Sequence, residues 1–196
     1  MASTAIKTEE EKKEYKDSPA ELDRKVTLLA KWVRESVYMT AFTGAGCSTA
    51  AGINDYRSGY ETMLPVGAGC WEKAANKAKA AAPKAGVRIA MANALPTPTH
   101  MGLVKLQQEG ILKYLVSQNV DGLHRKSGNP PDKLCELHGN RNLEYCVKCG
   151  KEYMRDFGVR STVPKGAHNH MTGRKCDNPA CRGDLKDSII NFNEPL

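Results

Sequence analysis

The chain has 196 residues, of which 40% are hydrophobic, and its formal net charge at pH 7 is +7. This length suits one domain of ordinary size, or one domain with a small insertion. The amino-terminal segment is charged and no apolar run approaches the length of about 18 residues that a membrane span needs, so neither a signal peptide nor a membrane span is expected. A basic balance permits acidic partners such as nucleic acid, chromatin or nucleotide phosphates.

The predicted elements begin after a polar segment, residues 1–17, which is expected to be a disordered tail. A helix is expected to follow, because the sequence SPAE at residues 18–21 fits a capping box with proline at the first helical position. Apolar residues then recur on one helical face at Leu22, Val26, Leu29 and Val33.

Strands and helices alternate further along the chain. Short apolar runs predict buried strands at residues 37–42, 113–117, 133–137 and 188–192. Helices are predicted to begin near residues 49–52 and to occupy residues 70–81 and 99–109. This alternation is typical of a parallel α/β sheet, in which ligands bind beyond the carboxyl ends of the strands. We therefore expect the polar segments that follow the first three strands to converge on one crevice.

Four of the seven cysteines have the spacing of a zinc site. Cys146 and Cys149 form a C-x2-C pair, and Cys176 and Cys181 form a C-x4-C pair. Two such pairs supply four thiolates in a tetrahedron and leave no open position for water, so the expected zinc ion is structural. Without a secretory signal, clustered cysteines favour metal ligands over disulfides and place the protein in the cytosol or nucleus.

Other histidines and cysteines offer weaker alternatives. His168 and His170 could compete as zinc ligands, although they are expected to lie on a solvated loop. Cys135 falls within a strand pattern and is expected to be a small buried hydrophobic residue. Cys47 lies in a glycine-rich turn, where a nucleophilic role is conceivable, but its local motif holds no His or Asp.

A glycine-rich turn follows the first predicted strand. Gly44, Ala45 and Gly46 let the backbone approach a pyrophosphate, and a helix start follows. The GxGxxG fingerprint is incomplete because Thr49 occupies its third glycine position, so a plain tight turn is the alternative. The segment 55–57 reads Asp-Tyr-Arg, residue types that can position a ribose, cover a ring and pair with a phosphate.

Two further polar segments follow strands, at residues 118–124 and 136–140. A histidine in such a turn can act as a general base, because the ordinary pKa of histidine lies near physiological pH. His138 is the candidate by position. The alternative is a structural histidine whose hydrogen bonds are satisfied.

Six segments, taken together and in order, carry a resemblance to a known family. They are TGAGCSTAAGINDYR, PTPTHMGLVKL, LVSQNVDGLHRKSG, ELHGN, the cysteine module and LKDSIINF. In these segments the chain resembles the sirtuin family of NAD-dependent protein deacylases over residues 20–195, and it is most similar to the nuclear type IV branch. It departs from the family pattern at Cys47 and Asn54, where isoleucine and proline are usual.

The resemblance implies a cofactor, a reaction and site residues. NAD would be bound by Gly44, Ala45, Gly46, Thr49, Asp55, Tyr56, Arg57, Trp71, Gln118 and Asn119. His138 would be the general base, with Asn119 and Asp121 beside the nicotinamide ribose. The implied reaction removes the acyl group from an acylated lysine of a protein substrate, a histone being one candidate, and releases nicotinamide and acyl-ADP-ribose. The implied location is the nucleus, with the cytoplasm as the alternative.

The resemblance also implies a domain organisation. A Rossmann-like NAD-binding domain would comprise residues 18–140 and 185–196, with an inserted zinc-ribbon module at residues 141–184. On this resemblance the carboxyl-terminal half of the Rossmann domain would be missing, so the chain is expected to be a truncated form that is weakly active or inactive by itself and prone to aggregate.

Other functions are kept as alternatives. A non-catalytic zinc-bearing module that binds chromatin, nucleic acid or a partner protein is one, because residues 141–186 contain ten Lys or Arg against five Asp or Glu. Transfer of ADP-ribose to a protein is another and belongs to the same chemistry. A hydride-transferring dehydrogenase is disfavoured by the incomplete dinucleotide fingerprint.

Overall fold

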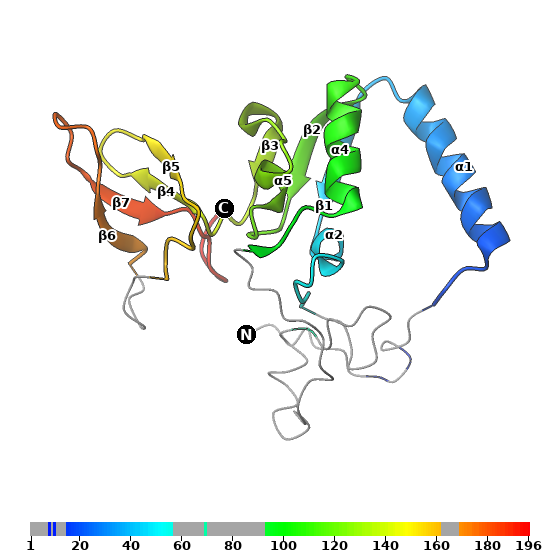
Figure 1. The fold of residues 1–196 in the computed structure, drawn as a ribbon, viewed down its shortest axis with the longest axis horizontal. Helices are drawn as coiled ribbons and strands as arrows, with labels where there is room; N and C mark the ends of the chain where they lie inside the picture. The colour runs from blue at the N-terminus through cyan, green and yellow to red at the C-terminus, as the bar shows by residue number, and fades with distance from the viewer. Residues whose placement is uncertain (1–7, 9, 11–14, 57–68, 70–92, 162–168) are drawn as a thin grey trace.

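Two separate sheets organise the part of the chain that the structure describes (Figure 1). The computed structural model describes residues 8, 10, 15–56, 69, 93–161 and 169–196. A parallel sheet has the order β1-β2-β3, with β1 at Met39–Thr43, β2 at Leu112–Ser117 and β3 at Leu134–Glu136. An antiparallel sheet has the order β5-β4-β7-β6, with strands β4 (Leu143–Cys146), β5 (Glu152–Met154), β6 (Met171–Lys175) and β7 (Asp184–Asp187).

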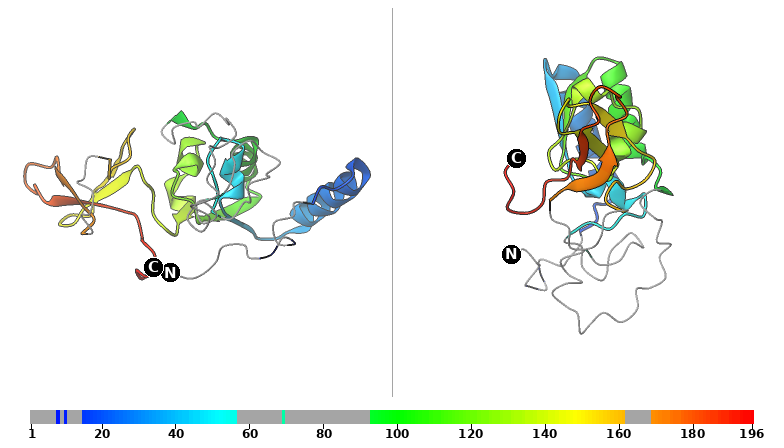
Figure 2. Two further views of the ribbon diagram at one scale, coloured as in Figure 1. Left: turned by 90° about the horizontal axis from the view of Figure 1, so that it is seen from below. Right: turned by 90° about the vertical axis from the view of Figure 1, so that its left-hand side faces the viewer.

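The helices belong to the amino-terminal part of the chain and to the parallel sheet. They are α1 (Pro19–Glu35), α2 (Gly46–Thr49), α4 (Pro98–Gln108), α5 (Leu123–Lys126) and the 3-10 turn η3 (Pro131–Lys133). In the views of Figure 1 and Figure 2, α1 and the antiparallel sheet lie at opposite ends of the molecule, with the parallel sheet between them. None of the helices in the described ranges is long and apolar enough to cross a membrane.

Helix α1 begins where the sequence predicts. Pro19 is its first residue, and the hydroxyl of Ser18 accepts a hydrogen bond from the Glu21 backbone N–H at 3.3 Å, which satisfies one of the free donors of the first turn. The apolar face is exposed, however. Leu22, Val26, Leu29 and Trp32 are each more than half exposed, and α1 contains no buried residue.

The strand predictions at residues 37–42, 113–117 and 133–137 are confirmed by β1, β2 and β3. The prediction that the first strand is buried is wrong, because Phe42 is 66% exposed. Within the described residues, strand β1 pairs only with β2 and lies at the edge of the sheet, and alternate side chains of a strand point to opposite faces. The carboxyl ends align, with Thr43 opposite Ser117 and Ser117 opposite Glu136. The three polar segments therefore start from one edge of the sheet.

The helix predicted at residues 99–109 is confirmed by α4. It ends before Gly110, whose φ of 69° is left-handed and stops the helix. The start near residues 49–52 is placed too late, because α2 begins at Gly46 and is only one turn long. The segment 70–81 lies outside the described residues.

The strand predicted at residues 188–192 is wrong, because the last strand is β7 and belongs to the antiparallel sheet. Leu185 is its fully buried apolar residue. The Asp187 carboxylate accepts the Ile189 N–H at 2.9 Å, a local turn that ends the strand. The apolar pair at 189–190 suggested a strand, but a side-chain hydrogen bond competes there with sheet pairing.

Candidate functional site

The first two polar turns are joined at the edge of the parallel sheet. The Gln118 N–H donates to Thr43 O at 3.0 Å, and the Asn119 side-chain amide donates to Gly44 O at 3.0 Å. Thr49 lies half-buried at the end of α2, and its hydroxyl donates to Gly46 O at 3.0 Å. The glycine-rich turn therefore has the backbone of the next strand end as its neighbour, as the topology predicts.

A buried polar network holds Asn119 and Asp121. The Ser48 hydroxyl donates to Asp121 Oδ2 at 2.6 Å, and Asn119 Nδ2 lies 3.3 Å from Ser48 Oγ. The second oxygen of Asp121 accepts the Leu123 N–H at 2.9 Å. All three polar side chains are at most 9% exposed. Because each is hydrogen-bonded, the network fixes these groups instead of leaving unsatisfied polar atoms.

A second network lies behind the first and contains two buried histidines. His124 Nε2 lies 2.8 Å from Thr43 Oγ1, His100 Nδ1 lies 2.8 Å from Thr97 Oγ1, and the two rings are 4.6 Å apart. The Thr97 hydroxyl donates to Cys47 O at 2.8 Å. Burial, and then the neighbouring His100, lower the pKa of His124 to about 4. His124 therefore stays neutral near pH 7 and has a structural place beneath the glycine-rich turn.

His138 is held by the strand end next to it. Its Nδ1 lies 2.8 Å from Gln118 O, and its side chain is half-buried. A carbonyl oxygen only accepts, so Nδ1 carries the proton and Nε2 is the free acceptor in the neutral ring. The structure thus brings the predicted histidine to the predicted Gln118 with one ring nitrogen available to take a proton.

The remaining predicted nucleotide residues are placed in part. Ala45 and Asp55 are half-buried, and Tyr56 is 44% exposed, in the segment that follows α2. Arg57 and Trp71 lie outside the described residues. Burial raises the pKa of Cys47, which disfavours the thiolate and argues against a nucleophilic role.

The four predicted zinc cysteines converge. Their sulfur atoms all lie within 4.8 Å of one another, with Cys146 Sγ 3.5 Å from Cys181 Sγ and Cys149 Sγ 3.8 Å from Cys176 Sγ. A tetrahedron with Zn–S bonds of about 2.3 Å has sulfur atoms about 3.8 Å apart, so the spacing fits a zinc ion. Among the described residues, no other group of three or more metal-binding side chains gathers in this way.

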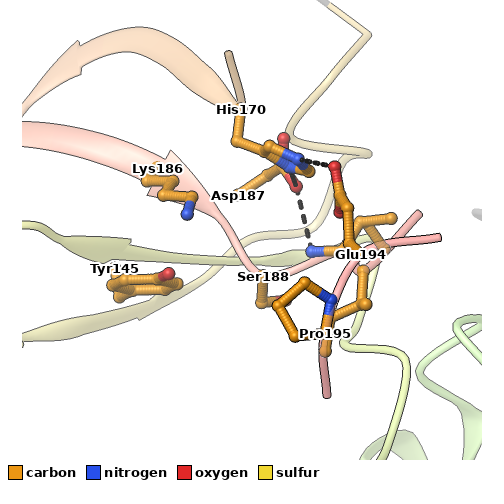
Figure 3. Close-up of a pocket in the computed structure, with 9 residues that line it drawn as sticks. Tyr145, His170, Lys186, Asp187, Ser188, Glu194 and Pro195 are labelled. Carbon is orange, nitrogen blue, oxygen red and sulfur yellow. Dashed lines mark hydrogen bonds and ion pairs between the residues drawn. The ribbon is translucent and has the colours of Figure 1, made fainter. Parts of the chain in front are cut away.

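The structure also places two of the other residues considered in the sequence, Cys135 and His170. Cys135 is half-buried, not fully buried. His170 does not lie on a solvated loop. Its Nδ1 lies 3.0 Å from Asp187 and its Nε2 lies 2.8 Å from Glu194, and its side chain is only 10% exposed (Figure 3). The hydrogen bonds with Asp187 and Glu194 raise its pKa. His168 lies outside the described residues.

The pocket in Figure 3 has a volume of about 390 Å³ and lies between β7 and the segment that follows it. His170, Asp187 and Glu194 line one part, and Tyr145 and Lys186 line another. None of the residues predicted to bind NAD lines this pocket. It is therefore a feature of the antiparallel sheet and not the predicted nucleotide crevice.

Comparisons with known proteins bear on this arrangement. The model of the Sir2 family matches residues 44–196, from the glycine-rich turn through the cysteine cluster to the last residue. The chain belongs to the Sir2 family. The family resemblance inferred from the motifs is thereby confirmed. The Rossmann-like parallel sheet that the resemblance implied is confirmed as well.

Sirtuin relatives and solved sirtuin structures resemble most of the chain. NAD-dependent protein deacetylase SRT1 of Oryza sativa subsp. indica is 41% identical over 182 residues, which are 92% of this chain and 34% of that protein. NAD-dependent protein deacetylase sirtuin-7 of Homo sapiens is 40% identical over 91% of this chain and 40% of its own length. The structure described as "Sir2-p53 peptide-NAD+" has a TM-score of 0.53 at 27% identity and covers 87% of this chain and 66% of that chain. The chain thus spans well under half the length of these two curated relatives.

Sequence reasoning missed the buried acids of this sirtuin's antiparallel sheet. Glu144 on β4 is fully buried, and its carboxylate receives Arg155 Nε at 2.8 Å and Arg174 Nη2 at 2.7 Å. Asp187 is 1% exposed and lies opposite Glu144 in the β4–β7 pairing. A signal for Asp187 was present, because alternation along β7 puts it on the same face as buried Leu185.

Proposed function

We propose that the protein represented by this chain is an NAD-dependent protein-lysine deacylase. The observation that carries the proposal is the contact between His138 Nδ1 and Gln118 O, beside the Asn119 amide that bonds Gly44 O. These two contacts place the proton acceptor His138 and the glycine-rich turn at the same place, the carboxyl end of β2. The names of the relatives, NAD-dependent protein deacetylases, support the same activity.

The proposed cofactor site comprises residues of the three polar turns. The donor chemistry fits a dinucleotide, because backbone groups and side-chain amides converge on a turn that two glycines keep open. NAD would be held by Gly44, Ala45, Gly46, Thr49, Asp55, Tyr56, Arg57, Trp71, Gln118 and Asn119. When bound, NAD would supply a ribose carbon that the acyl oxygen of a modified lysine can attack as the bond to nicotinamide breaks.

The roles of the chain's own residues in the reaction follow from their contacts. His138 takes a proton at Nε2, because Nδ1 is committed to Gln118 O. Asn119 and Asp121 orient the ribose side of the site, since Ser48 and neighbouring backbone hold both side chains. A buried, hydrogen-bonded frame of this kind needs no rearrangement as the reaction proceeds.

The proposed domain organisation keeps the zinc module separate from the chemistry. Cys146, Cys149, Cys176 and Cys181 would hold one structural zinc ion, since four thiolates leave no position for water. Residues 18–140 would form most of the NAD-binding part, and the zinc module would begin near residue 141. Protein substrates bearing an acylated lysine, histones among them, and a nuclear location complete the proposal.

Release of nicotinamide tests the proposal. The zinc-loaded chain is incubated with NAD and an acetyl-lysine peptide, and nicotinamide and acetyl-ADP-ribose are measured. We expect both products from the wild type, loss of both in His138→Ala, and retention of both in Lys105→Ala, whose side chain is exposed on α4. Product formation by folded His138→Ala at the wild-type rate, or no product from either the folded chain or a longer version of it, contradicts the proposal. ADP-ribose attached to protein, without free acetyl-ADP-ribose, would identify the transferase alternative.

A further inference from the structure

The turn that carries His138 is fastened to the segment that follows β7. The Ile190 N–H donates to His138 O at 3.1 Å. At the other end of the turn, the Ser188 hydroxyl accepts the Asn140 N–H at 2.9 Å and donates to Asn140 O at 2.9 Å. A single hydroxyl therefore satisfies both backbone groups of Asn140, while the backbone of residue 190 fixes the histidine itself.

Between these two anchor points the backbones touch. Gly139 has a φ of 76°, a left-handed conformation that side chains rarely adopt. A Cβ atom built there would lie 1.8 Å from Ser188 O. The glycine thus permits a close approach of Ser188 that no other residue type allows.

The side chain of Asn140 extends this hydrogen-bond network into the parallel sheet. Its side chain is fully buried, and its amide donates to Glu136 Oε1 at 2.8 Å while its oxygen accepts the Asn142 N–H at 2.9 Å. Glu136 in turn pairs with Arg125 Nε at 2.8 Å. A shift of Asn140 therefore disturbs the strand end from which His138 projects.

Strand β7 ties Ser188 to the cysteine cluster. Gly183, two residues after Cys181, accepts the Cys176 N–H at 2.8 Å. Leu185 is fully buried and packs in one cluster with Cys146 and Cys176. The Ser188 N–H donates to Leu143 O at 3.2 Å, so the same strand reaches from the cysteines to the His138 turn without an intervening loop.

We propose that Ser188 is a positioning residue for His138, and that it transmits the order of the zinc sheet to the histidine turn. Ser188 contacts no reacting atom and acts through the backbone of Asn140. Its catalytic consequence rests on the proposed function, whereas its effect on the histidine does not. The order that a bound zinc ion gives the antiparallel sheet would then reach the His138 turn through the Ser188 hydroxyl, beside the backbone bond from Ile190 to His138 O.

The variants Ser188→Ala and Ser188→Thr test this role. Alanine removes both hydrogen bonds, while threonine keeps the hydroxyl at this half-buried position. Ser161→Ala is the control, because the Ser161 hydroxyl donates to Gly158 O within the zinc-sheet region. Each variant is checked for one equivalent of zinc before comparison.

The primary readout is the pair of ring 15N chemical shifts of His138, which report which nitrogen carries the proton. We expect Ser188→Ala to lose the single Nδ1-protonated signature and the threonine and control variants to keep it. In nicotinamide release, we expect Ser188→Ala to lower kcat by roughly tenfold to a hundredfold with little change in KM for the peptide, since small misplacements of a catalytic group cost this much. Threonine should restore most of kcat.

A folded, zinc-loaded Ser188→Ala with wild-type His138 ring shifts overturns the proposal. If that variant does not fold, hydrogen exchange of the wild type decides, because the Asn140 amide must then be protected and rapid exchange of it refutes the contact. Displaced ring shifts in a chain that releases no nicotinamide would support the positioning role while the deacylase proposal fails.

Discussion

The buried carboxylate of Glu144 offers the sharpest test of what holds the zinc sheet together. Burial alone would raise the pKa of Glu144, but hydrogen bonds from Arg174, Thr172 and Arg155 keep it below the ordinary value. Glu144→Gln keeps the shape and removes the charge, leaving two arginines without their counter-ion. Removing one partner of a buried pair costs about 3–5 kcal/mol. Because Arg155 and Arg174 are 30% and 24% exposed, solvent screens part of this cost, and we expect about 2–3 kcal/mol.

The assay is urea unfolding of the zinc-loaded chain. Unfolding is monitored by the release of zinc to a colorimetric indicator. The matched control is Glu152→Gln on the neighbouring strand β5, where the carboxylate is 60% exposed and lies 3.5 Å from Arg125. We expect the control to stay within about 0.5 kcal/mol of the wild type, as surface pairs do. Equal unfolding free energies for the two variants would refute the assignment of Glu144 as the buried anchor of the sheet.

Three further predictions concern protonation and metal. The hydrogen bonds that protonated His170 donates to Asp187 and Glu194 raise its pKa, so the stability they add is full below about pH 6.5 and is lost as pH rises through the raised value. Hydrogen exchange of the segment after β7, followed against pH, measures this, and a flat profile contradicts it. His124, with its pKa lowered to about 4, favours the neutral ring, so stability should fall by roughly 2–4 kcal/mol between pH 6.5 and 4, and His124→Gln should remove that part of the slope. Cys181→Ser should lose bound zinc and expose β4–β7 to proteolysis while Cys135→Ser keeps one equivalent, and zinc retention by the first would disprove tetrahedral ligation.

Local patterns predicted the parallel sheet because each of its strands is a short apolar run that ends in a polar turn. The alignment of Thr43, Ser117 and Glu136 then follows from parallel pairing alone. The cysteine cluster was predictable for a similar reason, since two close pairs need only two turns to meet. These features depend on near neighbours or on simple topology.

The strand at the end of the chain was not predictable in this way. Ile189 and Ile190 look like a strand, but the Asp187 side chain ends β7 by bonding Ile189 N–H, and Ser188 turns to Asn140. Ser188 and Asn140 are 48 residues apart, so no local pattern contains their contact. His170 was misjudged for the same reason, because its two carboxylate partners come from later segments of the chain.

Several basic side chains of the zinc region are ion-paired with acids, which bears on the proposed contact with chromatin or nucleic acid. Glu144 and Asp187 are buried opposite each other on β4 and β7, and like charges in that position destabilise a sheet unless they are neutralised. Arg155 and Arg174 neutralise Glu144, and Arg160 and a histidine neutralise Asp187. Two more cations have partners on the surface, in the pairs Lys151–Asp177 and Lys175–Asp184. Five of the ten basic residues at 141–186 are therefore ion-paired with acids, namely Lys151, Arg155, Arg160, Arg174 and Lys175. Pairing leaves the net charge unchanged, so these five give little support to a nucleic-acid surface, which would depend on the other basic residues.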